Sequence, residues 1–336
     1  MTLRITILGA GVMGLCAATE LVRRGACVRL LDPKGPPGPH GCSWWAGGML
    51  APFCEAVTAE ASVVRLGQEA AAWWEGAGAS VIRAGTLVVA LGRDRVEVER
   101  FAARSTGHRI LDAEGLDALE PGLSARFSRA LHFPGEAHLD PRAALAALHV
   151  GLSSRGVDVE AFHGAADGTG GSDTDITIDC RGLAAADTLP DLRGVRGEMA
   201  VLRAPDVALS RPVRLLHPRH PLYIVPRGEG LYMLGATQIE TAHRGPVTAR
   251  SVLELMGAAY ALDPAFGEAE VLELGADARP AFPDNLPRIR RRGSTILVNG
   301  LFRHGFLLSP ALARMVADLV LDGKHPEVMD EDHGEW

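Results

Sequence analysis

The first 32 residues contain an order of elements that restricts the fold more than any other part of the chain. Residues 5–8 form an apolar run with β-branched side chains, which predicts a buried strand. The segment Gly9-Ala10-Gly11-Val12-Met13-Gly14 follows, then helical apolar spacing as far as Val22, a second apolar run at residues 27–31, and Asp32. Strand, glycine turn, helix, strand and acid in this order are typical of a βαβ unit that binds a dinucleotide.

The three glycines and the acid have separate physical roles in such a unit. Gly9 permits the tight turn, Gly11 lets a pyrophosphate approach the backbone because it has no Cβ, and Gly14 lets the helix pack close to the strand. The helix N-terminus provides free N–H groups and a partial positive charge for the phosphates. Asp32 follows Gly14 by 18 residues, where an acid accepts hydrogen bonds from an adenosine ribose. We therefore expect an ADP-containing dinucleotide, either NAD or FAD.

Two alternatives exist for this segment. One is a secretory signal peptide, in which Arg4 precedes an apolar stretch and small residues. The paired glycines would weaken that apolar stretch, and the acid at the end of the second strand would have no explanation. The other is an ordinary α/β turn with incidental glycines, which the motif alone leaves open.

Length and composition indicate a globular protein with a large core. The chain has 336 residues, 47% hydrophobic and 22% charged, which suits two domains or one large α/β domain with an inserted sheet. The net charge of −7 and the scattered Lys and Arg argue against nucleic acid or an anionic membrane surface as the main partner. The one basic run, residues 290–292, is interpreted as a solvated turn. No apolar segment reaches about 18 residues, so we expect no membrane span.

The five cysteines are widely spaced and lack a Cys-x-x-Cys pair. They therefore indicate neither a disulfide framework nor a metal site, and we expect no metal. Cys16 and Cys27 fall in the apolar βαβ unit and are expected to be buried. Unpaired thiols are typical of the reducing cytoplasm, which is the predicted location.

The middle of the chain does not alternate regularly between strands and helices. Residues 175–180 predict a strand that returns to the first sheet. Residues 195–202, a hairpin at residues 222–235 and residues 271–278 predict a mostly antiparallel block, with an amphipathic helix at residues 247–262. We interpret this block as a substrate domain.

A second strand–glycine loop–helix unit lies near the end of the chain. Residues 295–299 predict a strand, and a loop bounded by Gly300 and Gly305 follows. Ser309 is predicted to cap the next helix, with Pro310 at its first position. An NAD enzyme would not need this unit. With a flavin, a helix N-terminus near the pyrimidine end of the ring would favour the negative charge of the reduced form.

Residues 42–52 have no period of 2 or 3.6, and they combine small residues with Trp44 and Trp45. One interpretation is a packed loop. The other is a backbone surface against a flat ligand, which Gly47 and Gly48 would contact without a Cβ. The sequence does not decide whether either tryptophan touches the cofactor.

Together these motifs resemble those of the glycine oxidases, FAD-dependent amine oxidases of the D-amino acid oxidase superfamily. The resemblance covers about residues 6 to 321 and is weakest between residues 52 and 130. The motifs that carry it, in order, are Gly9 to Gly14, Ser43 to Met49, Tyr223-Ile224-Val225-Pro226-Arg227, Gly235-Ala236-Thr237, Ala278-Arg279-Pro280 and Gly300-Leu301-Phe302-Arg303-His304-Gly305.

The resemblance implies an α/β fold of the D-amino acid oxidase type, in which a mainly antiparallel α+β substrate domain is inserted into a Rossmann-like FAD-binding domain. The expected FAD-binding domain is discontinuous and comprises residues 1–82, 130–194 and 285–336. The expected substrate domain comprises residues 83–129 and 195–284.

The resemblance also implies roles for individual residues. Arg279 and Arg303 would hold the substrate carboxylate, and Tyr223 would line the pocket beside it. These residue types suit the task, because a guanidinium fork anchors and orients a carboxylate with two parallel hydrogen bonds. The residues expected to contact FAD are Gly9, Gly11, Val12, Met13, Gly14, Asp32, Pro33, Cys42, Ser43, Gly47, Gly48, Met49, Gly300, Leu301, Phe302, Arg303, His304, Gly305, Phe306 and Leu307.

The implied reaction is oxidative deamination of glycine and other small amino acids, such as sarcosine and D-alanine, with O2 reduced to H2O2. The expected pathway role is to supply the glycine imine for the thiazole of thiamin, with thiazole synthase as the downstream consumer. No cysteine follows Cys180, so the covalent cysteinyl-flavin link of monomeric sarcosine oxidase is excluded and noncovalent FAD is expected. The sequence is compatible with a homo-oligomer.

Three alternatives to this function remain open. One is a D-amino acid or sarcosine oxidase, and another is a quinone-linked amino acid dehydrogenase on the same fold. The third is a flavin-binding module without catalytic activity. Gln238, at a position where the best-known glycine oxidase pattern has methionine, and the Trp44-Trp45 pair depart from the family and affect the expected substrate profile.

Overall fold

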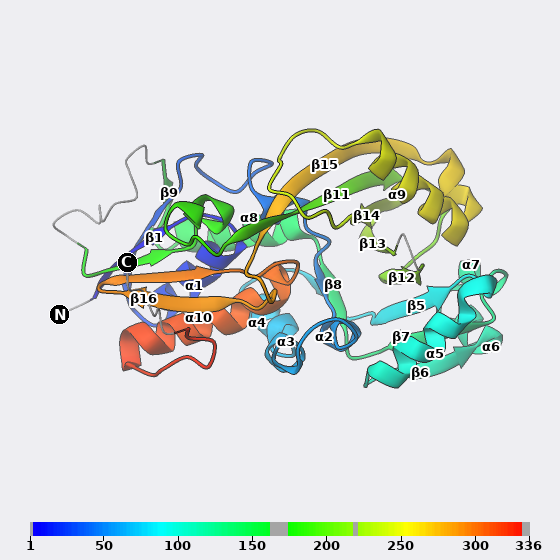
Figure 1. Cartoon of the computed structure of the whole chain (residues 1–336), viewed down its shortest axis with the longest axis horizontal. Coiled ribbons are helices and arrows are strands. Elements are labelled where there is room, and N and C mark those ends of the chain that lie inside the picture. The colour runs from blue at the N-terminus through cyan, green and yellow to red at the C-terminus, as the bar shows by residue number, and fades with distance from the viewer. Residues whose placement is uncertain (1–2, 162–173, 218–220, 331–336) are drawn as a thin grey trace.

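A computed structural model describes residues 3–161, 174–217 and 221–330 of the chain. Figure 1 shows two lobes, each built on a large sheet, with a small three-stranded sheet in the region between them. Within the described residues, no helix is both long enough and apolar enough to cross a bilayer.

The first large sheet has six strands in the order β16-β17-β10-β1-β2-β9. Their bounds are β1 Arg4–Leu8, β2 Cys27–Leu31, β9 Val159–Glu160, β10 Ile176–Asp179, β16 Arg288–Arg292 and β17 Thr295–Asn299. β1 pairs in parallel with β2 and with β10, and β10 pairs in parallel with β17. The predicted βαβ unit and the predicted return of residues 175–180 to its sheet are therefore confirmed.

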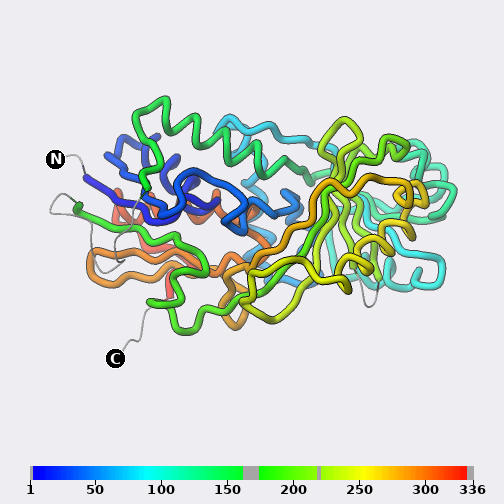
Figure 2. The backbone as a smooth tube through the Cα atoms, turned by 90° about the horizontal axis from the view of Figure 1, so that it is seen from above, coloured from blue at the N-terminus to red at the C-terminus, as the bar shows by residue number. Residues whose placement is uncertain are grey.

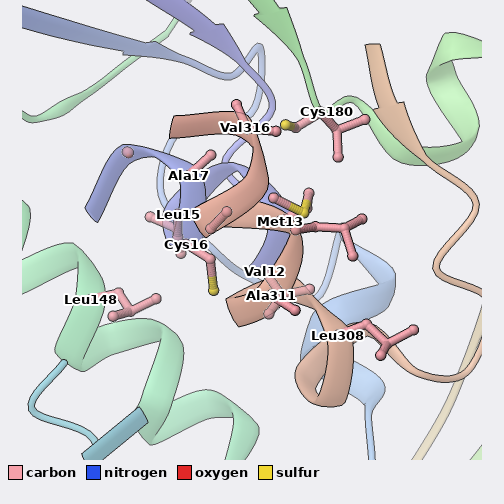
Figure 3. Packing of buried hydrophobic residues seen from close by; sticks show 14 of the residues in the cluster. Val12, Met13, Leu15, Cys16, Ala17, Leu148, Cys180, Leu308, Ala311 and Val316 are labelled. Atoms are coloured by element: carbon pink, nitrogen blue, oxygen red, sulfur yellow. The ribbon is translucent and has the colours of Figure 1, made fainter. Parts of the chain in front are cut away.

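Helices cover this sheet, and their buried side chains contribute to the hydrophobic core of the lobe. α1 (Val12–Arg23) packs against α10 (Gly305–Asp322) and α8 (Pro141–Ser153), as the side chains of Figure 3 show. Cys16 is buried in this core as expected, but Cys27 is exposed at the start of β2. The expectation for Cys27 was wrong because side chains alternate between faces along a strand. The remaining helices of this lobe are α2 Pro52–Glu55, α3 Ala61–Gly67 and α4 Ala70–Gly76.

The second large sheet has eight strands in the order β15-β11-β14-β13-β12-β5-β7-β6. Their bounds are β5 Thr86–Ala90, β6 Arg109–Asp112, β7 Arg129–Phe133, β11 Arg193–Arg203, β12 Val213–Leu216, β13 Leu222–Gly228, β14 Leu231–Gly235 and β15 Glu270–Ala281. All its pairs are antiparallel except β5–β12, which joins the two chain segments that form the sheet. The helices of this lobe are α5 Arg95–Arg104, α6 Ala113–Leu119, α7 Pro121–Ser124 and α9 Ala249–Leu262.

The sheet memberships differ in detail from the predicted domain boundaries. β7 pairs with β5 and β6, so residues 130–133 lie in the eight-stranded sheet and not with the FAD-binding segments. The small sheet, β3 (Met49–Leu50), β8 (Ala137–Leu139) and β4 (Val81–Ile82), lies where chain segments pass between the lobes (Figure 2). The division of the chain into two domains remains a prediction.

Helix α10 begins at Gly305, five residues before the predicted first position at Pro310, and Pro310 lies inside it. A proline in a helix leaves the carbonyl four residues earlier without its N–H partner. Here that carbonyl belongs to Phe306, and the indole Nε1–H of Trp74 donates to it at 2.8 Å. The rings of Trp74 and Phe306 also stack, with their centroids 5.4 Å apart. A hydrogen bond from outside the helix thus lets the first turn form ahead of the proline.

The basic run at residues 290–292 is not a turn, because it lies in strand β16, antiparallel to β17. Arg290 is buried, and its Nη1 and Nη2 donate to the two carboxylate oxygens of Asp191 at 2.8 and 2.7 Å. Arg290 Nη2 also donates to Asp330 at 2.8 Å. The interpretation as a solvated turn was therefore wrong, since two distant acids neutralise the central charge and let the segment pair.

Candidate active site

A cavity of about 610 Å³ extends from the end of β1 to α9 and is lined by residues of both lobes. Tyr223, Arg279 and Arg303, the predicted substrate-binding residues, all line it. So do all the predicted FAD-contacting residues except Gly14 and Gly300. Those two glycines act by packing: a Cβ on Gly14 would overlap the carbonyl oxygen of Gly9, and one on Gly300 would lie 2.5 Å from Cε2 of Phe282.

The end of the cavity at β1 has the features that a pyrophosphate needs. Gly9 has φ of +98°, which favours glycine, and a Cβ there would lie 2.6 Å from the carbonyl oxygen of Cys180. A Cβ on Gly11 would meet only the Ser43 hydroxyl, at 3.4 Å, so a ligand can approach this backbone closely. The first turn of α1 contains no acidic residue that would repel phosphate. The residues present therefore fit the phosphates of a dinucleotide.

Asp32 is held in place by backbone donors. The Ala10 N–H donates to its Oδ2 and the Lys34 N–H to its Oδ1, each at 2.9 Å. Each carboxylate oxygen keeps a lone pair, so Asp32 can accept further hydrogen bonds from a ribose. Ser43 Oγ accepts a hydrogen bond from the Val12 N–H at 3.1 Å, which attaches the 42–52 segment to the start of α1.

The other end of the cofactor region is the loop between β17 and α10. Phe302 has φ of +51°, an uncommon conformation for a residue with a side chain, and its N–H donates to the carbonyl oxygen of Pro280 at 2.9 Å. This bond connects the loop to β15 next to Arg279. The first turn of α10 carries no acidic residue, and Gly305 and Phe306 line the cavity. The helix N-terminus is therefore available to a group that gains negative charge.

Arg279 is a half-buried cation that lines the cavity and has no acidic partner among the described residues. In the part of the chain that the structure describes, no Asp or Glu pairs with it, and its one hydrogen bond runs from Nη1 to the carbonyl oxygen of Thr237 at 3.4 Å. Burial lowers the pKa of Arg279, with Tyr223 opposing that shift and Arg303 adding to it. Removing a guanidinium partly from water without a compensating charge is costly, so its presence in a cavity indicates a site for an anionic group.

Tyr223 is positioned by two glycines. It lies on β13, and a Cβ on Gly47 would come within 2.6 Å of its Cε2, while one on Gly235 would come within 2.7 Å of its hydroxyl oxygen. The sequence predicted that Gly47 makes room for the flavin. The structure shows that Gly47 makes room for the tyrosine ring, and its contact with flavin stays a prediction.

Arg303 has an acidic partner, unlike Arg279. Its Nη2 donates to Oε2 of Glu55 and to Oγ1 of Thr58, the latter at 2.7 Å. Among the described residues, Nε and Nη1 of Arg303 make no hydrogen bond, so these two donors remain available. Its role in holding a substrate carboxylate stays a prediction.

The sequence did not identify Glu55 and Arg214, which both line the cavity. Arg214 Nη2 donates to Oε1 of Glu55 at 2.6 Å, and Arg214 Nη1 donates to the carbonyl oxygen of Cys54 at 3.0 Å. These residues belong to no motif. The one feature of the sequence that could have drawn attention to Glu55 is an acidic residue in a short segment that begins with Pro52.

The tryptophan pair fixes the 42–52 segment to the second lobe. A Cβ on Gly275 of β15 would overlap the Trp45 ring, and Trp45 Nε1–H donates to the carbonyl oxygen of Pro39 at 3.0 Å. The guanidinium of Arg142 lies 4.7 Å from the Trp44 ring centroid and 5.4 Å from that of Trp45. Trp45 lines the cavity, and its main contact is with β15.

Comparison with known proteins agrees with this geometry. The pattern of the family described as FAD dependent oxidoreductase matches residues 4–319. A Rhizobium etli protein named as the thiamine biosynthesis oxidoreductase ThiO is 54% identical over 320 residues, which are 95% of this chain and 97% of that protein. A glycine oxidase of Pseudomonas aeruginosa is 28% identical, over 97% of this chain and 96% of its own.

A solved structure gives the same result for the fold. The crystal structure of glycine oxidase from Geobacillus kaustophilus matches with a TM-score of 0.80 at 23% identity, over 97% of each chain. The predicted fold class, the family resemblance and the FAD cofactor are thus confirmed. The chain belongs to the FAD dependent oxidoreductase family and is an FAD-dependent enzyme of the glycine oxidase and ThiO type.

Proposed function

We propose that the protein oxidises glycine and other small amino acids to the imine, which water hydrolyses to the 2-oxo acid and ammonia, while O2 is reduced to H2O2. The observation that carries the proposal is Arg279, a half-buried cation without an acidic partner among the described residues, in the cavity whose other end suits a dinucleotide. When bound, FAD supplies the two-electron acceptor for the amine and passes the electrons to O2.

In this proposal the protein contributes mainly binding and orientation. Arg279 holds the carboxylate, so the substrate is fixed by the end that does not react. Tyr223 donates a hydrogen bond to the same carboxylate, and Nε or Nη1 of Arg303 adds another donor. No side-chain base is required if the amine reaches the flavin uncharged. Glycines leave the space that these two side chains occupy: Gly197 beside Arg279, and Gly47 and Gly235 beside Tyr223.

We further propose that the product imine enters the thiazole of thiamin, with thiazole synthase as its consumer. The name of the Rhizobium etli relative supports this role. The proposed location is the cytoplasm, where the five free thiols would stay reduced. Noncovalent binding of FAD is part of the proposal, and release of the flavin by acid would test it.

One experiment separates this proposal from its alternatives. The purified flavoprotein is assayed for peroxide with glycine, sarcosine and D-alanine, and the flavin spectrum is followed with the same substrates without oxygen. Peroxide with the highest kcat/KM for glycine is expected. A clear preference for D-alanine or sarcosine would instead identify a D-amino acid or sarcosine oxidase. Bleaching without peroxide would identify a dehydrogenase, and an unchanged spectrum would identify a flavin-binding module without catalytic activity.

A further inference from the structure

Glu55 is the centre of a charged cluster that we call the Glu55 cluster: Glu55, Arg214, Arg303 and His304. Arg214 donates to one carboxylate oxygen of Glu55, and Arg303 and His304 reach the other, His304 Nε2 at 3.0 Å. The three partners come from β12, the β17–α10 loop and the residue before α10. All four side chains line the cavity that contains Arg279 and Tyr223.

The anion at the centre of this cluster is the side-chain carboxylate of Glu55. Burial by itself would raise the pKa of Glu55, but Arg214 and Arg303 hold that pKa well below its usual range, so the carboxylate is ionised. Two guanidinium groups and an imidazole thus converge on one carboxylate. The arrangement is the one that proteins use to bind carboxylate ligands, with Glu55 in the position of the ligand.

Hydrogen bonds to other elements also hold the backbone next to Glu55. The preceding residue, Cys54, donates its N–H to Oε1 of Glu136 at 2.7 Å and accepts from Arg214 through its carbonyl oxygen. Glu136 is itself buried, so water does not compete for its hydrogen bond to Cys54. The Glu55 carboxylate is therefore held in one place and does not sample the cavity freely.

We propose that Glu55 determines substrate specificity, because its carboxylate occupies the anion site of the Glu55 cluster and excludes substrates that carry a second acidic group. The inference rests on the proposed function in so far as the substrates are amino acids. Arg279, with the free donors of Arg303, then binds a single substrate carboxylate, which suits glycine, sarcosine and D-alanine. A dicarboxylate would place its second charge beside an ionised carboxylate that already takes hydrogen bonds from Arg214 and Arg303, so it would find the anion site filled.

The test measures ligand binding and needs no turnover. Acetate and malonate, which differ by one carboxylate, are titrated into the FAD-loaded protein by calorimetry. We expect the wild-type protein to bind acetate about tenfold more tightly than malonate or better, as like-charge repulsion requires. In Glu55→Gln, which keeps the shape but removes the charge, we expect this ratio to change in favour of malonate by about tenfold or more.

The same variant makes a prediction for substrates. The ratio of kcat/KM for D-aspartate to that for D-alanine is expected to rise in Glu55→Gln by about tenfold or more, mainly through KM. Glu160→Gln is the matched control, since Glu160 pairs with Arg29 on the surface and leaves the cavity charge unchanged. If Glu55 had a structural role only, both ligand ratios would stay as in the wild type while the melting temperature fell.

Two results would overturn the proposal. One is a wild-type protein that binds malonate as tightly as acetate, which needs no variant and so holds even if Glu55→Gln does not fold. The other is a folded, yellow Glu55→Gln protein with unchanged ratios. Failure of the proposed oxidase function would look different: no peroxide would form with glycine, while the binding ratios would still change.

Discussion

Gly197 on β11 lies directly beneath the guanidinium of Arg279 on β15. A Cβ on Gly197 would come within 2.6 Å of Nη1 of Arg279 and would overlap Nη2. The two strands are antiparallel neighbours, with Gly197 opposite Asp277. The space for the cation therefore depends on a missing side chain on the adjacent strand, and no motif around Arg279 reveals this.

Gly197→Ala is expected to displace the Arg279 guanidinium while leaving the dinucleotide end of the cavity unchanged. Loss of a well-aligned charged hydrogen bond costs about 1.5–3 kcal/mol, so KM for glycine should rise by about tenfold or more with FAD still bound. Steady-state peroxide assays and the flavin content of the purified protein measure both effects. Gly194→Ala does not serve as a control, because a Cβ there would lie 2.6 Å from Cα of Ala242. Gly257→Ala does, since nothing lies within 4 Å of that position.

Arg279→Ala is expected to retain FAD and to raise KM for glycine more than Gly197→Ala does, because the carboxylate loses its main charged partner. The matched control is Arg83→Ala, which breaks an exposed ion pair with Glu75 and should leave kcat/KM within a factor of about two. Unchanged kinetics in Arg279→Ala would remove this residue from the site.

Trp74→Phe is expected to destabilise the fold by about 1–3 kcal/mol, because the Phe306 carbonyl inside α10 loses its donor. Adding Pro310→Ala restores the helical N–H that this carbonyl lacks. The double variant should therefore recover part of the loss, and a double-mutant cycle of denaturant unfolding measures the coupling. Strictly additive effects would contradict the assignment of the indole as the substitute donor.

His138 predicts an acid-sensitive fold. It is buried on β8, neither ring nitrogen has a hydrogen-bond partner among the described residues, and burial, together with Arg227, lowers its pKa to about 4. The His pKa is about 6.5 in the unfolded chain. Between the two pKa values His138 is therefore protonated in the unfolded chain and neutral in the folded protein. Stability from this group is thus fully present above about pH 6.5 and is lost as the pH falls toward 4. Melting temperatures of His138→Phe should fall less between pH 6.5 and 4 than those of the wild type, and equal slopes would exclude His138 as the cause.

The parts of the fold that the sequence predicted correctly are those whose signal is local. The βαβ unit is an example, since the apolar run of β1, the glycines and Asp32 lie within the first 32 residues. The strand predicted at residues 295–299 is another, since its apolar run coincides with β17. In each case the residues that determine the structure are neighbours in the chain.

The errors have the opposite origin. Ser309-Pro310 resembles a helix start, and only Trp74, 232 residues from Phe306, lets the helix begin earlier. The basic run at residues 290–292 resembles a turn until Asp191 and Asp330 neutralise Arg290. Glu55 and Arg214 are 159 residues apart and lie in no motif, so the charge arrangement of the site became visible only in three dimensions.

The place of β17 and α10 in the six-stranded sheet has a consequence for biosynthesis. β17 pairs with β10, and α10 packs against α1, so both contribute to a sheet whose first strands come from the opening residues. Translation releases those opening strands long before residues 295–322 emerge. During that interval an unpaired strand edge and an apolar helix face are exposed to solvent, surfaces on which chaperones act. The six-stranded sheet and the loop between β17 and α10 can therefore form only after residues 295–322 have been synthesised.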